Sequence, residues 1–104
     1  MFLEHKEAVE ITPAKVLKLS EAIRIGAKIR PQCTYSYFTR GKSCALGAAA
    51  EALYGVTEKT FSTTHINKIT SKLSRVVVSE IIERNDDLHW TREQIADWLE
   101  GQGY

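Results

Sequence analysis

The chain has 104 residues, of which 43% are hydrophobic and 26% are charged, and its formal net charge is +1. These values suit one globular domain over residues 1–104. They exclude a membrane-spanning protein, because no apolar run in the sequence approaches the roughly 18 residues that a spanning helix needs.

Two features of the sequence predict a cytoplasmic setting. Residues 1–7 are charged where a secretory signal would be apolar, so export is not expected. The only two cysteines, Cys33 and Cys44, are therefore expected as free, reduced thiols.

The charges are distributed unevenly along the chain. Residues 1–78 contain 12 Lys and Arg against 6 Glu, a net of +6, whereas residues 79–104 contain 2 Arg against 7 Asp and Glu, a net of −5. The acidic C-terminal segment is expected to fold back onto the basic part, or else to keep the two parts for different partners.

The N-terminal part of the sequence has a clear helix signal only after residue 11. Residues 8–11 alternate like a short extended segment, and residues 1–11 fit a loosely ordered end equally well. The Thr12-Pro13 pair then predicts a helix over about 13–29, which Pro31 would end. An alternative start lies near Ser20, which is followed by an acidic residue.

Residues 31–42 form a connection rich in aromatic and hydroxyl side chains. Alternation over 33–38 predicts a brief extended segment. Tyr35, Tyr37 and Phe38 either close a small core or form a contact surface for another protein.

A helix of mostly small residues is predicted over 43–54 and is the centre of the expected fold. Ser43 is its predicted N-cap, and Gly55 stands where a helix commonly ends in the left-handed conformation. Its small side chains would let neighbouring backbones approach closely; these are Ala45, Ala48, Ala49 and Ala52.

Two further helices are predicted in the second half. The first spans 64–85, where apolar side chains recur every three or four residues and form one stripe along the helix. The residues of this stripe are Ile66, Ile69, Leu73, Val76, Val77 and Ile81. The β-branched run at 76–78 favours a strand instead, but the stripe continues on both sides of it. The second spans 91–100 and opens with a capping box of Thr91 and Gln94. The expected fold class is therefore all-α, a compact bundle of three to four helices.

Several known site patterns fail on one required residue. Arg40–Ser43 ends like a phosphate-binding loop, but Ser36 stands where its first glycine is needed. A calcium loop beginning at Asn85 would need a glycine at Trp90. Close Cys or His pairs of a structural zinc site are absent from the sequence. No metal site and no cofactor are predicted, and no catalytic residue is assigned; Cys44 acting with a histidine is the least supported function.

A basic patch gives the alternative functional hypothesis. Lys59, Lys68, Lys72 and Arg75 are candidate contacts for nucleic-acid phosphates, three of them on the predicted 64–85 helix. The simpler interpretation is a solvated helix face, or a partner for the acidic C-terminal segment. A helix-turn-helix built on 91–99 is excluded, since no recognition helix can follow it before Tyr104.

Four segments of the chain, in this order, resemble a group of small uncharacterised proteins from bacteria and phages. They are residues 19–24, 43–49, 85–86 and 90–99, within a match that covers most of 18–100. The resemblance implies a bacterial cytosolic setting and assigns no activity. The leading hypothesis is thus a non-enzymatic module that binds an unknown protein through the aromatic residues at 35–38 or through the acidic end, with weak nucleic-acid binding as the alternative. The sequence does not define the oligomeric state.

Overall fold

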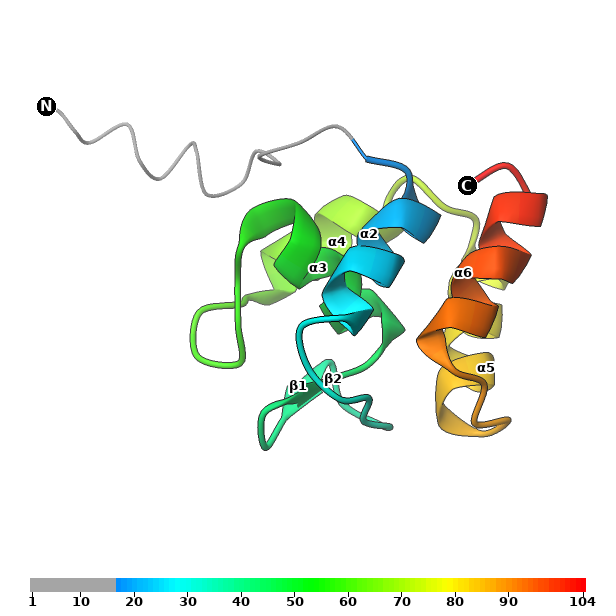
Figure 1. Ribbon diagram of the computed structural model, residues 1–104. Helices are drawn as coiled ribbons and strands as arrows, with labels where there is room; N and C mark the ends of the chain where they lie inside the picture. The colour runs from blue at the N-terminus through cyan, green and yellow to red at the C-terminus, as the bar shows by residue number, and fades with distance from the viewer. Residues whose placement is uncertain (1–16) are drawn as a thin grey trace, which may run out of the picture.

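The computed structural model describes residues 17–104, in which five helices and one two-stranded sheet are found (Figure 1). The predominantly helical class is confirmed, but the expectation of three to four helices without a sheet is wrong. The possible extended segment at 8–11 and the Thr12-Pro13 helix start lie outside the described residues. The elements are α2 (Leu19–Ala27), β1 (Phe38–Thr39), β2 (Lys42–Ser43), α3 (Ala45–Tyr54), α4 (Thr63–Thr70), α5 (Arg75–Asp86) and α6 (Arg92–Gly101).

The small-residue helix α3 is the central element, as the sequence predicts. Helix α2 packs against it on one side and against α6 on the other, while α5 lies behind α6 (Figure 1). The largest fully buried apolar side chains come from four of the helices and meet in one core; they are Ile23, Leu46, Ile81, Ile95 and Leu99. Within residues 17–104, none of the helices has the length and apolar character needed to cross a membrane.

Helix α2 begins at Leu19 and ends at Ala27, so within the described residues the predicted span of 13–29 is too long at both ends. The alternative start near Ser20 is closer to the observed one. The Glu21 carboxylate accepts a hydrogen bond from the backbone N–H of Lys18 at 2.8 Å, which satisfies a free donor at this helix end. The chain terminus closes the same end, because the carbonyl oxygen of Tyr104 accepts from the Ser20 N–H and hydroxyl.

The aromatic segment, residues 33–38, is bent rather than extended over most of its length. Only Phe38 belongs to a strand, which pairs antiparallel with β2 in the register Phe38–Ser43 and Thr39–Lys42. The two residues of the connecting turn, Arg40 and Gly41, both have positive φ, as this tight hairpin requires. A separate parallel bridge joins Gln32 to Ser43, so three chain segments meet at β2.

The N-cap of α3 is one residue later than predicted. Cys44 caps the helix, its sulfur accepting from the Gly47 N–H at 3.4 Å, while Ser43 belongs to β2. Ser43 is fully buried, and its hydroxyl accepts from the Arg92 guanidinium instead. The predicted C-terminal end is confirmed, because Gly55 adopts the left-handed conformation.

The single helix predicted over 64–85 is wrong: the chain breaks at residues 71–74 into α4 and α5. Ser74 adopts extended backbone angles, and its hydroxyl accepts from the Val77 N–H at 3.2 Å, which starts a new helix. The break also changes which side chains of the predicted stripe are buried. Ile69 and Ile81 lie in the core, whereas Val76 is 65% exposed.

Helix α6 agrees with its prediction to within a residue, including the Thr91–Gln94 capping box. Its acidic face binds Arg24 of α2, which contacts three carboxylates of α6, those of Glu93, Asp97 and Glu100. This contact is the expected folding of the acidic segment onto the basic part of the chain. At the start of α6, the buried Arg92 donates to the carbonyl oxygens of Ala27, Arg30 and Ser43, which joins three segments.

Candidate functional site

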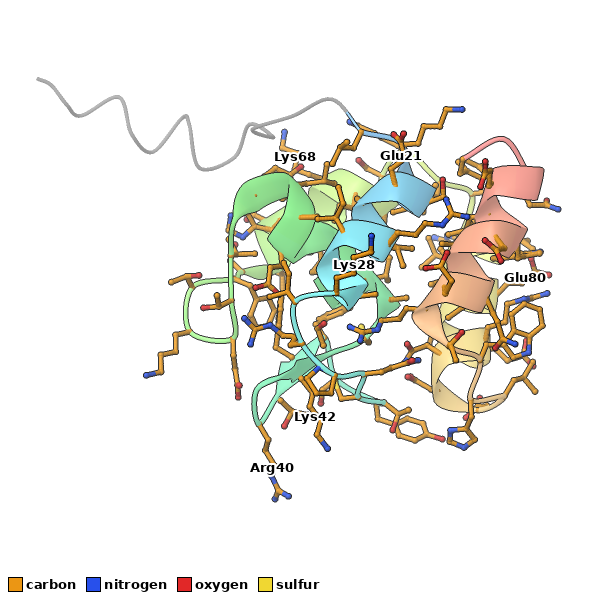
Figure 2. The ribbon with its side chains drawn as sticks, in the orientation of Figure 1. Glu21, Lys28, Arg40, Lys42, Lys68 and Glu80 are labelled. Carbon is orange, nitrogen blue, oxygen red and sulfur yellow. The ribbon has the colours of Figure 1, made fainter. Side chains whose placement is uncertain are left out.

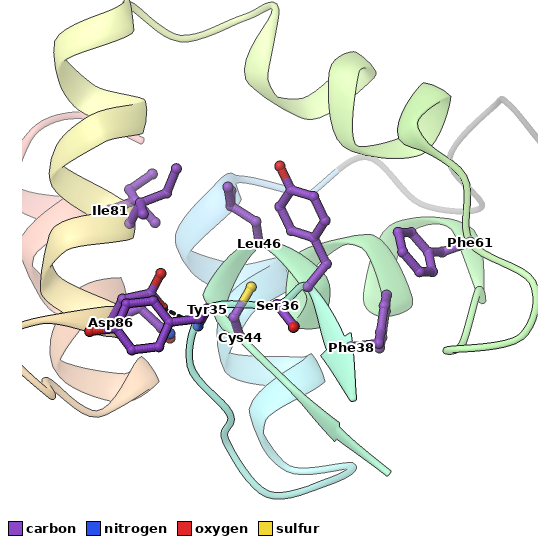
Figure 3. A pocket seen from close by; sticks show the side chains of 11 residues that line it. Tyr35, Ser36, Phe38, Cys44, Leu46, Phe61, Ile81 and Asp86 are labelled. Atoms are coloured by element: carbon purple, nitrogen blue, oxygen red, sulfur yellow. Dashed lines mark hydrogen bonds between the residues drawn. The ribbon is translucent and has the colours of Figure 1, made fainter. Parts of the chain in front are cut away.

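A pocket of about 550 Å³ lies between the aromatic segment, the N-terminal end of α3 and helix α5 (Figure 3). A cavity of this size is in the range that holds small ligands or protruding side chains. Most of its walls are apolar, contributed by Tyr37, Phe38, Leu46, Phe61, Ile81 and Ile82. Its remaining lining comes from Tyr35, Ser36, Cys44, Asn85 and Asp86.

All three predicted protein-contact residues line this pocket, but their surroundings differ. Phe38 is buried and packs on Phe61 with ring centroids 5.0 Å apart, so it is a core residue. Tyr37 is half-buried and meets the same ring edge-on at 6.2 Å. Tyr35 is 70% exposed and has a φ of 63°, which is uncommon for a residue with a side chain. Phe38 therefore closes a small core, as one of the two interpretations expects, whereas a protein contact through the exposed Tyr35 stays a prediction.

The bent conformation at Tyr35 is held by the C-terminal end of α5. The Asp86 carboxylate accepts from the Tyr35 backbone N–H at 2.9 Å, and the Asp87 carboxylate accepts from its hydroxyl at 2.8 Å. The bond to Asp87 raises the pKa of the Tyr35 hydroxyl. These two hydrogen bonds hold Tyr35 in its bent conformation at the surface.

Asn85 fixes the base of the same segment. It is only 2% exposed, and its amide donates to the carbonyl oxygen of Cys33 at 2.9 Å. Its oxygen accepts from the Ala45 N–H at 3.1 Å and from the Gln32 side chain at 2.9 Å. Because these bonds reach both the aromatic segment and the first turn of α3, Asn85 joins the three walls of the pocket.

The sequence predicts that Asn85 and the two aspartates after it satisfy backbone groups at the helix ends, as Asn85 does at Ala45, but it does not predict that Asn85 joins the walls of a pocket. The signal was present in the spacing: Asn85 follows Val77 and Ile81 at four-residue intervals on the buried stripe of α5. A polar side chain at such a position must find partners inside the protein, because a buried amide without hydrogen bonds is costly. The sequence does not show which backbone groups these partners would be.

The thiol of Cys44 lines the pocket beside Ser36 (Figure 3). Burial raises the pKa of Cys44 to about 11, so the thiol is protonated at neutral pH. A protonated thiol is a poor nucleophile and contributes apolar surface instead. Among residues 17–104, no group of three or more His, Cys, Asp and Glu side chains is arranged to hold a metal ion.

The four candidate nucleic-acid contacts are all exposed, but they do not share one helix. Lys59 lies in the connection before α4, Lys68 in α4, Lys72 in the break and Arg75 at the first residue of α5. Other cations lie elsewhere on the surface. In Figure 2, Arg40 and Lys42 of the hairpin are at the opposite end of the view from Lys68.

The end of α5 next to the pocket carries three carboxylates, here called the acidic rim, of which only that of Asp86 lines the pocket itself. Glu83 and Asp86 stand on the last turn of this helix, Asp87 is its C-cap, and the half-exposed Ile82 precedes them. Carboxylates at a helix C-terminus lie at the negative end of the helix dipole, where their charge is unfavourable. Among the described residues, none of the three forms an ion pair. The acidic rim therefore places negative charge beside an apolar cavity, and Asp86 and Asp87 use part of their hydrogen-bonding capacity to hold Tyr35.

No protein-family model, curated protein or solved structure significantly matches this chain. The resemblance to small bacterial and phage proteins stays a prediction.

Proposed function

We propose that the protein is a non-enzymatic interaction module that binds a short segment of another protein. An apolar side chain of that segment enters the pocket, and a Lys or Arg next to it meets the acidic rim. The observation that carries this proposal is the cavity of about 550 Å³, walled by aromatic and aliphatic side chains, with the Asp86 carboxylate of the acidic rim in its lining.

The apolar part of the proposal follows from what lines the cavity and its mouth. Inside are the rings of Tyr37 and Phe61 and the aliphatic chains of Leu46 and Ile81. At the mouth, Tyr35 is 70% exposed and Ile82 is 41% exposed, so apolar surface continues outward from the cavity. A side chain anchored in a pocket with aromatic residues around it is the usual centre of a protein interface.

The rigidity of the aromatic segment favours binding. Tyr35 is held through its N–H and its hydroxyl, and Asn85 holds the base of the segment. A binding surface that is already ordered loses less conformational entropy when a partner arrives. The strained φ of Tyr35 is maintained by these bonds, which is typical of residues positioned for contact.

The charge of the rim selects the kind of partner. Glu83, Asp86 and Asp87 add negative charge to the C-terminal end of α5. A cationic side chain brought to this place gains from the carboxylates and from the helix dipole together. An acidic segment would meet repulsion at the same place, so the rim discriminates between partners by charge.

The alternative, weak nucleic-acid binding through Lys59, Lys68, Lys72 and Arg75, stays a prediction. The break between α4 and α5 removes the single helix face on which it depended. The pocket itself is bordered by carboxylates, which repel phosphates.

Amide NMR of isotope-labelled protein tests the proposal with three matched synthetic peptides. Each is a short Gly and Ser sequence with a central pair, Phe-Lys, Phe-Glu or Ala-Lys. The Phe-Lys peptide is expected to shift the amides of residues 35–38 and 81–87. The other two should shift them less at equal concentration, because each lacks one of the two contacts.

Two substitutions on α5 serve as a matched pair. Ile82→Arg places a charge at the mouth of the pocket and should weaken Phe-Lys binding by about tenfold or more. Val76→Arg makes the same change at an exposed position outside the pocket lining and should leave the affinity unchanged. The proposal is overturned if no peptide shifts the pocket amides, or if only a small aromatic such as indole does. Shifts by short DNA confined to residues 59–75 would favour the nucleic-acid alternative instead.

A further inference from the structure

The two cysteines lie on chain segments that a parallel bridge places side by side. Gln32 is bridged to Ser43, with the Cys33 N–H donating to the Ser43 carbonyl and the Ser43 N–H to the Pro31 carbonyl, both at 3.0 Å. Cys33 and Cys44 are the residues that directly follow this isolated bridge on the two segments, so a continued parallel register would place them opposite each other. Neighbouring strands are about 5 Å apart, within the roughly 4.4–6.8 Å between Cα atoms that a disulfide requires.

In that register the two cysteine side chains would point to the same side of the bridge. Gln32 and Ser43 point to the opposite side, where they bond to Asn85 and Arg92. The thiols accordingly lie on the side of Ser36. The Cys33 sulfur donates to the Ser36 carbonyl at 3.4 Å, and the Cys44 sulfur lies next to Ser36 in the pocket (Figure 3).

We propose that Cys33 and Cys44 are a modification site, where a low-molecular-weight disulfide such as oxidised glutathione converts the two thiols into one intramolecular disulfide. The bond would tie the aromatic segment to the N-terminal end of α3. This inference does not depend on the proposed protein binding.

The reaction balances with one glutathione disulfide. The Cys33 thiolate attacks one sulfur of the oxidant, forming a mixed disulfide and releasing one glutathione thiolate, which takes up a proton. Cys44 then loses its proton and attacks the Cys33 sulfur, and the second glutathione leaves. Two protein thiols are oxidised, and one glutathione disulfide is reduced to two glutathione molecules.

The order of attack follows from the surroundings of the two thiols. Burial raises the pKa of both, but the positive charge of Arg92 partly opposes this at Cys33. Cys33 therefore forms a thiolate more readily and reacts first. Both side chains are only 8% exposed, so the oxidant reaches them when the aromatic segment opens, and the reaction is slow.

Mass spectrometry of the full chain, incubated with oxidised glutathione and then alkylated, tests the proposal. The expected product is lighter by two hydrogen atoms and carries no glutathione. Trypsin cuts after Arg40 and Lys42, so the two cysteines fall into separate peptides that only a disulfide keeps together. The cross-link should also raise the Tm, on the order of 10 °C, because it closes a loop in the unfolded chain.

Single substitutions supply the controls. Cys33→Ala and Cys44→Ala should give neither the linked peptides nor the rise in Tm, and Cys44→Ala should collect glutathione on Cys33 faster than Cys33→Ala does on Cys44. The proposal is overturned if the wild-type chain accumulates glutathione adducts without linked peptides. It is equally overturned if linking occurs only in urea, because the folded chain would then not hold the two thiols together.

Discussion

Helix α3 has two very different neighbours, and their comparison explains how one small protein contains both a tight core and an open pocket. On the side of α2, the two backbones touch: a Cβ atom built on Gly26 would lie 2.0 Å from the carbonyl oxygen of Ala48. At the N-terminal end of α3, Leu46 and Cys44 face α5 and the aromatic segment across a cavity of about 550 Å³.

The size of the facing side chains accounts for the difference. Gly26 and the alanines of α3 leave nothing between the helices, so no space remains to be filled. Around the pocket, large rings and branched side chains keep three backbones apart, and rigid rings do not fill an irregular gap between them. Polar groups such as Asn85 then hold these walls in place where apolar contact is missing.

The contact between α2 and α3 should be the more sensitive of the two regions. Gly26→Ala would place a methyl group against the backbone of Ala48, which cannot move unless the helices separate. We expect the free energy of unfolding to fall by about 3 kcal/mol or more, as measured by urea unfolding.

Gly101→Ala is the matched control for this substitution. It makes the same change in α6, at a position where an added Cβ atom meets nothing within 4 Å. It should leave stability unchanged or raise it by up to about 1 kcal/mol, since alanine favours the helix. Equal effects of the two substitutions would contradict a backbone contact at Gly26.

On the pocket side of α3, the free energy of unfolding should depend on Asn85, with an effect that is large but smaller than that of Gly26→Ala. Asn85→Ala leaves the Ala45 N–H and the Cys33 carbonyl without these partners in a buried place. We expect a loss of about 2–4 kcal/mol in urea unfolding, together with faster hydrogen exchange at Ala45.

Asp87→Ala tests whether this loss is specific to the buried network. Asp87 is exposed, and its side chain accepts only the Tyr35 hydroxyl among the described residues. Its removal should cost within about 0.5 kcal/mol. If both variants lose equal stability, Asn85 is not the residue that joins the walls of the pocket.

Short-range signals in the sequence were sufficient to predict those helices whose ends are set by residues close together in the chain. Helix α6 was predicted from the capping box of Thr91 and Gln94, whose hydrogen bonds span three residues. The central place of α3 followed from its small side chains, and its end from Gly55. In these elements the residues that decide the structure are close in the sequence.

The break between α4 and α5 and the pocket itself could not be predicted in this way. Residues 71–74 contain neither Gly nor Pro, and the apolar stripe continues through them, so the cap at Ser74 was overlooked. The aromatic segment was recognised by its composition, but the pocket requires α5 to meet it, about 45 residues later. The bonds of Asn85 and Asp86 that create this contact join groups far apart in the chain.

The last expected effect is the change of stability with pH that the buried Cys44 thiol causes, and this change reports whether water enters the pocket. Burial raises the pKa of Cys44 from 9.0 to about 11. Above pH 9 the unfolded chain loses this proton while the folded chain keeps it, so the free energy of unfolding falls until about pH 11. The total loss from this group is about 3 kcal/mol, since each of the two pKa units corresponds to about 1.36 kcal/mol.

Urea unfolding of wild type and Cys44→Ala across this pH range measures the contribution of this thiol. Cys33, Tyr35 and Tyr54 also have raised pKa values, but they are present in both proteins, so their effects cancel in the difference. The stability of the wild type should fall toward that of the variant as the pH rises. Parallel curves would mean that water reaches Cys44 freely, and the cavity would then be an open, hydrated groove rather than the dry pocket that an apolar side chain needs.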